Sequence, residues 1–138
     1  MVVARPHSRH VSTVLLVGFG GFLGANLRFS LGAIAGEALV ATLLVNTIGS
    51  FGLGVLLFDA RADEFFSRRS RYIFGTGFFA SFTTYSTFVA DMFLTEPVVG
   101  VIYAGGSYCA GFGGVLVSRW LVGWAASGAI HAPAGDRG

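Results

Sequence analysis

The hydropathy pattern divides the chain into four long apolar stretches joined by short connections. A membrane-spanning helix needs about 20 consecutive, mostly apolar residues, and each stretch is long enough. We therefore predict four spans, at 13–34, 38–58, 72–94 and 98–124. The connection at 59–71 is polar, and Glu96-Pro97 makes a tight break before the last span. Because lipid offers the backbone no hydrogen-bond partners, each span must be helical, and the predicted fold class is an all-α membrane protein.

The length of the chain indicates one domain with two flanking segments. We assign 1–12 to an N-terminal segment, 13–126 to the four-helix transmembrane domain, and 127–138 to a C-terminal tail. The tail is rich in small and polar residues, so we expect it to be disordered.

The third stretch carries unusual polar chemistry in its middle, where residues 75–88 read G-T-G-F-F-A-S-F-T-T-Y-S-T-F. A lipid-facing helix has no use for so many hydroxyl groups, so this segment must face protein, water or a permeating solute. Irregular backbone at membrane depth is tolerated where it is buried in protein or lines a cavity. This span is therefore the candidate for irregular backbone and for function.

The composition supports the membrane location and narrows the function. Hydrophobic residues make up 54% of the chain and charged residues 12%, with a mean hydropathy of +0.71. A soluble domain carries about twice that share of charge. The sequence has no nucleophile–base pairing and no phosphate-binding loop, so we do not expect an enzyme. The three histidines lie in the terminal segments and Cys109 stands alone, so no metal cluster and no disulfide framework are expected.

The charges that flank the spans predict the orientation. With four spans, the two termini and the middle connection share one side of the membrane. That side holds most of the arginines, namely Arg5, Arg9, Arg61, Arg68, Arg69, Arg71 and Arg137, with Arg119 near the end of the last span. The opposite connections hold no lysine or arginine. By the positive-inside rule we predict a multi-pass protein of the plasma membrane with both termini in the cytoplasm.

Two polar side chains inside the first two spans are candidate functional residues. Arg28 is costly within the membrane, so it either attracts an anion, ties subunits together, or extends to the outer interface. Asn46 lies mid-span, where its amide either donates hydrogen bonds to an anion or bonds a neighbouring helix. The sequence leaves both alternatives open.

The third and fourth spans add aromatic and hydroxyl groups. Tyr85 and Phe88 are three residues apart and share a helical face, so their positive ring edges could solvate an anion. Hydroxyl donors stand nearby at Thr84, Ser86 and Thr87, and Tyr103 and Ser107 could extend the same polar track. The alternative is that the aromatic rings form a packing stripe and that the hydroxyl groups bond carbonyl groups of their own helix.

Four segments together resemble the Fluc (CrcB) family of fluoride channels. These are 20–29 (GGFLGANLRF), 42–51 (TLLVNTIGSF), 75–88, and the spacing of Tyr103, Ser107 and Gly111. Their order and spacing are specific together, although no single segment would be, and the resemblance covers nearly all of the spans.

The resemblance implies a fluoride-specific channel that lowers cytoplasmic fluoride by passive export. It implies an antiparallel, dual-topology dimer in lipid with two narrow pores, a broken third helix, and a central sodium ion held by backbone carbonyls. By position, Ala80 and Thr83 would supply these carbonyls, and Arg28 matches the arginine of the first span. The implied fluoride pore residues are Asn46, Thr84, Tyr85, Ser86, Thr87, Phe88, Tyr103 and Ser107.

The chain departs from the family pattern in the third span and in its charge distribution. Phe79-Ala80-Ser81 stands where the family has Cys-Gly-Gly, and Tyr85 replaces the first of two paired phenylalanines. A homodimer of antiparallel copies needs a chain that inserts both ways, whereas the arginines here are one-sided. Since the family also has members encoded as pairs of fixed, opposite orientation, we hypothesise that this chain is one half of a heterodimer; a homodimer remains the alternative.

Two other functions compete with the channel. A small proton-coupled multidrug efflux transporter would need a membrane-buried carboxylate, but the first span has none and Asp91 lies near the end of the third. A non-conducting membrane assembly subunit would explain the glycine-rich packing but not the hydroxyl run.

Overall fold

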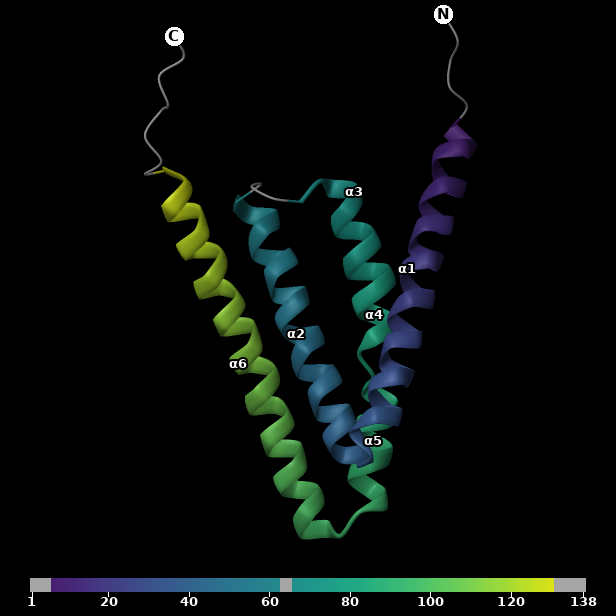
Figure 1. The fold of residues 1–138 in the computed structure, drawn as a ribbon, viewed down its shortest axis with the longest axis vertical. Helices are drawn as coiled ribbons and strands as arrows, with labels where there is room; N and C mark the ends of the chain where they lie inside the picture. Colours follow the sequence, from purple (N-terminus) through teal and green to yellow (C-terminus); the bar gives the residue numbers. More distant parts are fainter. Residues whose placement is uncertain (1–5, 63–65, 131–138) are drawn as a thin grey trace, which may run out of the picture.

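All regular structure in the described residues, 6–62 and 66–130 of the computed structural model, is helical. Three long helices are α1 (Pro6–Ala35), α2 (Ala38–Ala62) and α6 (Pro97–Ile130). The third crossing is divided into α3 (Arg68–Arg71), the π-helical η1 (Tyr72–Phe79), α4 (Ala80–Phe82) and α5 (Tyr85–Leu94). The chain runs back and forth four times, so that α1 begins and α6 finishes at the same end of the molecule (Figure 1).

The prediction of an all-helical, multi-pass protein is confirmed. By length and composition, α1, α2 and α6 each hold a candidate membrane span, at Val11–Ala35, Ala38–Ala60 and Pro97–Ser127. The third run is interrupted, as expected, so none of its pieces reaches that length. The first helix begins at Pro6, earlier than predicted, and α6 continues to Ile130, past the expected start of the tail. The rest of the predicted tail lies outside the described residues.

The turns between the crossings follow from local sequence. Gly36 has a φ of 70°, a left-handed conformation that glycine adopts without steric cost, and it ends α1. Thr95 is extended, and Pro97, whose ring fixes φ, opens α6. Both turns are short, so successive helices are antiparallel neighbours.

Helix α2 lies in the middle, between α6 on one side and the broken third crossing on the other (Figure 1). On the far side of that crossing, α1 packs against η1 and α4. The backbones approach closely there: a Cβ on Gly24 would overlap the Phe78 carbonyl, and one on Gly77 would lie 2.6 Å from the Val17 carbonyl oxygen. Small residues at such contacts are typical of membrane helix packing.

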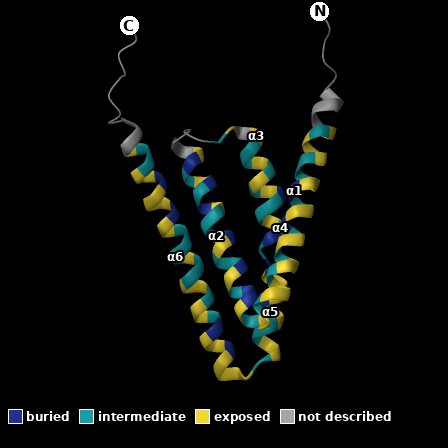
Figure 2. Cartoon of the chain, in the orientation of Figure 1, coloured by how far each residue is buried: buried dark blue, intermediate teal, exposed yellow. Residues whose placement is uncertain are grey.

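Few side chains are fully buried within one chain. Phe82 and Val45 are the most enclosed of the apolar core, at 1% and 2% exposed. Exposed residues run along the outer faces of α1 and α6 (Figure 2). Such faces are expected to contact lipid or another subunit rather than water.

Candidate functional site

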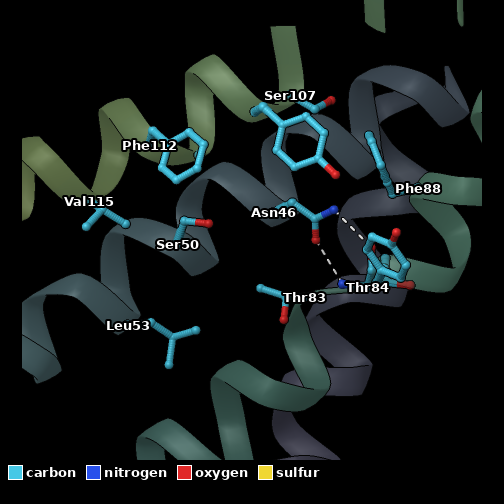
Figure 3. A pocket seen from close by; sticks show the side chains of 12 residues that line it. Asn46, Ser50, Leu53, Thr83, Thr84, Phe88, Ser107, Phe112 and Val115 are labelled. Carbon is cyan, nitrogen blue, oxygen red and sulfur yellow. Dashed lines mark hydrogen bonds between the residues drawn. The ribbon is translucent and has the colours of Figure 1, made fainter. Parts of the chain in front are cut away.

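The site is built around an interruption of the third crossing at Thr83 and Thr84. Both residues are extended, with φ and ψ of −73° and 157° at Thr83 and of −146° and 117° at Thr84. Asn46 of α2 bonds this interruption with both ends of its amide. Its Nδ2 donates to the Thr84 carbonyl at 2.9 Å, and its Oδ1 accepts from the Thr84 N–H at 2.8 Å (Figure 3). The interhelical bond that the sequence left open is therefore present, and one Nδ2 hydrogen remains for another acceptor.

Thr84 also caps the helix that follows. Its Oγ1 accepts from the Thr87 N–H at 3.2 Å and donates to Thr87 Oγ1 at 2.8 Å. The Ser86 hydroxyl lies 3.4 Å from the same oxygen. Capping by a threonine satisfies an amide that the start of a helix leaves without a partner. The hydroxyl run thus serves local structure at Thr84, Ser86 and Thr87, as well as any role toward a solute.

A cavity of about 400 Å³ opens between α2, α5 and α6 beside this interruption. It brings together five of the predicted pore residues, Asn46, Thr84, Tyr85, Phe88 and Ser107. The remaining lining residues are Ser50, Leu53, Thr83, Tyr108, Gly111, Phe112 and Val115 (Figure 3). Ser86, Thr87 and Tyr103 are not among the lining residues.

Aromatic rings form one wall of the cavity. Phe88 is 6% exposed, and its ring centroid lies 5.9 Å from that of Tyr85, 5.5 Å from Tyr103 and 5.8 Å from Tyr108. Tyr108 in turn lies 6.5 Å from Phe112. The predicted pair of Tyr85 and Phe88 is thus the start of a longer wall. The sequence analysis missed Tyr108 and Phe112, although their spacing of four residues on one helical face was a usable signal.

Buried hydroxyls lie close to this wall. Within the described residues, the hydroxyls of Tyr103 and Ser107 are buried without a well-formed hydrogen bond. Tyr103 faces Ser107, Thr42 and Asp91. Thr42 Oγ1 donates to Asp91 Oδ2 at 2.7 Å, a short, charge-assisted bond between α2 and α5. The residues predicted from the sequence as pore residues did not include Thr42 or Asp91.

Arg28 reaches the interruption of the third crossing. Its Nη1 donates to the Thr83 carbonyl oxygen at 3.4 Å. This bond lies within one chain, so an attraction for anions and a tie between subunits both stay predictions for Arg28.

The carbonyl groups of Ala80 and Thr83, the predicted sodium ligands, lack their helical hydrogen-bond donors. The N–H that would bond the Ala80 carbonyl in a continuous helix, that of Thr84, donates to Asn46 instead. The N–H that would bond the Thr83 carbonyl, that of Thr87, donates to the Thr84 side chain. Both oxygens are thus released from the helical pattern. Uncommitted backbone oxygens are ligands that hard cations prefer, and a carbonyl has two lone pairs, so Thr83 could serve Arg28 and an ion together.

Comparison with known proteins gives a consistent result. A family model described as CrcB-like protein, Camphor Resistance (CrcB), matches residues 15–125. The fluoride-specific ion channel FluC 1 of Haloarcula marismortui is 46% identical over 112 residues, which cover 81% of this chain and 87% of that protein. FluC 2 of Methanosarcina mazei is 42% identical over 98 residues, covering 70% and 77%. FluC 1 of Natronomonas pharaonis is 36% identical over 112 residues, covering 80% and 94%.

Proposed function

This chain belongs to the CrcB family, and we propose on that basis that it is a fluoride-specific ion channel that lowers cytoplasmic fluoride by passive export. The resemblance read from the sequence is confirmed, and the relatives are ion channels and not enzymes. The cavity beside Asn46 is the observation that carries the proposal. Its polar lining groups are uncharged amide and hydroxyl groups, which can donate hydrogen bonds to an anion inside the cavity.

Neutral donors suit a small anion that must enter and leave. Fluoride gives up water at the cavity, and the remaining Asn46 N–H and the Ser107 hydroxyl replace part of that shell, with the buried Tyr103 hydroxyl behind them. The edges of the Tyr85 and Phe88 rings carry partial positive charge and complete it. Binding stays weak enough for release because no fixed positive charge lines this cavity. Thr84, bonded by Ser86 and Thr87, holds the wall in place.

Two subunits are needed to close the pore. Along the cavity, Tyr85 is 72% exposed, Phe112 is 68% exposed and Tyr108 is 54% exposed. Rings so exposed are typical of a surface that a second subunit covers. In the proposed antiparallel dimer, each chain contributes its Ala80 and Thr83 carbonyls to a central sodium ion. That ion would join the two interruptions.

The orientation of the chain bears on which dimer forms. Both described ends lie at one end of the molecule together with α3, which holds Arg69 and Arg71 (Figure 1), and Arg119 lies in the second half of α6, toward the same end. A one-sided charge favours cytoplasmic termini and a single orientation. The proposed assembly is therefore a heterodimer with a second chain of the family in the opposite orientation, with the homodimer as its alternative.

Fluoride efflux from liposomes tests both parts of the proposal. The chain is reconstituted alone and with a candidate partner, and fluoride release is followed with a fluoride-selective electrode against a chloride control. Fluoride release from either preparation, without chloride release, supports the channel. Release only with the partner supports the heterodimer. Robust release from the chain alone, with both orientations present in protease protection, overturns the heterodimer, and no release from either preparation favours a non-conducting subunit.

A further inference from the structure

A second hollow lies on the outer face of α6, away from the cavity and independent of fluoride transport. It is a wide-open hollow of about 490 Å³, lined by α6 alone, through Leu116, Arg119, Trp120, Gly123, Trp124 and Ser127. Each of these positions has another member of the set three or four residues away, so they form a single stripe along the helix. Residues of α6 that pack on α2, such as Ser118 and Val122, are buried and lie on the opposite side. The stripe therefore faces outward.

The stripe lies at the depth of a membrane surface. Arg119 is 22 residues after Pro97, or about 33 Å along a helix that rises 1.5 Å per residue. Glu96, directly before α6, marks the opposite surface. Because the hydrocarbon core is about 30 Å thick, Arg119 reaches the interface at the arginine-rich end. Trp120 and Trp124 are each 68% exposed there, as expected of aromatic residues that anchor a helix at lipid headgroups.

Arg119 offers an uncompensated charge in this hollow. Within the described residues it forms no ion pair or hydrogen bond, whereas Arg71 at the same end is paired with the buried Asp59. Gly123 leaves open space between the two indole rings, since a Cβ there would meet no atom within 4 Å. A guanidinium beside two indoles and a gap can donate hydrogen bonds to a phosphate oxygen of a lipid headgroup, while the acyl chains run toward the membrane centre.

We propose that this hollow binds one anionic phospholipid, with its phosphate on Arg119, its headgroup beside Trp120 and Trp124, and its chains running past Leu116 toward the membrane centre. The charge complementarity and the interfacial depth favour a lipid over a second protein subunit. An anionic headgroup is favoured over a zwitterionic one because no carboxylate of the described residues neutralises Arg119. Bound there, the lipid would fix the depth and tilt of α6, the helix that carries Ser107 and the aromatic wall.

The two indoles make the proposal directly measurable, because Trp120 and Trp124 are the two tryptophans of the chain. The full chain is reconstituted in phosphatidylcholine vesicles that contain equal fractions of either brominated phosphatidylglycerol or brominated phosphatidylcholine. Quenching of tryptophan fluorescence then reports which lipid contacts the site. We expect a preference of about fivefold for the anionic lipid, which corresponds to about 1 kcal/mol for one basic side chain near an anionic surface.

Two charge-removing variants separate a site from general attraction. Arg119→Gln should abolish the preference while keeping the quenching by brominated phosphatidylcholine, which also shows that the variant is inserted. Arg69→Gln is the matched control, since Arg69 is exposed at the same end but on α3 and bonded to Ser12. It should keep the preference. Equal quenching by both lipids, an equal effect of the two variants, or protection of the indoles from both lipids by a second subunit would each overturn the proposal.

Discussion

Replacing Asn46 by aspartate tests the fluoride path most directly. A carboxylate at this position still accepts from the Thr84 N–H, but it cannot donate to the Thr84 carbonyl as the amide does at 2.9 Å. It also adds a negative charge to the wall of the cavity. Two unit charges about 4 Å apart interact by about 4 kcal/mol at an effective dielectric constant of 20. Fluoride occupancy should therefore fall by about a thousandfold.

The loss of the donated hydrogen bond adds to this effect. Leaving a buried carbonyl without its donor costs about 1–3 kcal/mol, so the interruption at Thr84 should also loosen. Asn46→Ala isolates this part, because it removes both hydrogen bonds and adds no charge. The alanine variant should lower the flux by a similar factor at every pH.

Lowering the pH separates the two effects of Asn46→Asp, the added negative charge and the lost hydrogen bond. A protonated aspartic acid is neutral and nearly the same shape as asparagine, and its O–H can donate to the Thr84 carbonyl. Flux through Asn46→Asp should be absent at neutral pH and partly recover as the pH is lowered. The assay is fluoride efflux from liposomes that carry the conducting assembly, with protein-free liposomes at each pH, because hydrogen fluoride crosses bilayers unaided. Flux within threefold of the unmodified channel at neutral pH would refute the path along Asn46.

Three further changes test the packing around the site, each read as a shift in the midpoint of thermal unfolding in detergent. Thr42→Val removes the hydroxyl that donates to the Asp91 carboxylate at 2.7 Å and should destabilise the fold by about 1.5–3 kcal/mol. An unchanged midpoint would show that water replaces this hydrogen bond. Phe88→Ala empties the centre of the aromatic wall and should cost about 3–5 kcal/mol and abolish flux, whereas Phe93→Ala, 76% exposed on the same helix, should do neither. Gly24→Ala forces α1 away from η1 and should destabilise, whereas Gly32→Ala meets open space and should not; equal effects would contradict the close approach.

The four crossings could be predicted from the sequence because lipid imposes a length and a composition on each of them. The π-helical segment Tyr72–Phe79, which packs against α1, could not, because π-helices are rare and hydropathy does not distinguish them from α-helices. The helix ends also differ from prediction. Hydropathy marks the apolar part of a helix, whereas α1 and α6 continue beyond it.

The sequence could predict several residues of the candidate site, but not the contacts that these residues make. The sequence indicated Asn46 and Phe88, and both line the cavity. It did not indicate that Asn46 would bond the backbone of Thr84, because that contact joins residues 38 positions apart. It also missed Tyr108, which reads as an ordinary apolar position until the bend of the third crossing brings Phe88 against it.

The position of the interruption changes how the departures from the family pattern should be read. The missing glycines fall at Ala80 and Ser81, where the backbone is helical, with φ and ψ of −65° and −29° at Ala80. The helix is interrupted only afterwards, at Thr83 and Thr84, in the extended region that any residue adopts. No glycine is therefore required to release the two carbonyls, which depend instead on Asn46 and on the Thr84 cap. Tyr85 and the one-sided arginines, and not the missing glycines, are therefore the features of this chain that favour a partner chain.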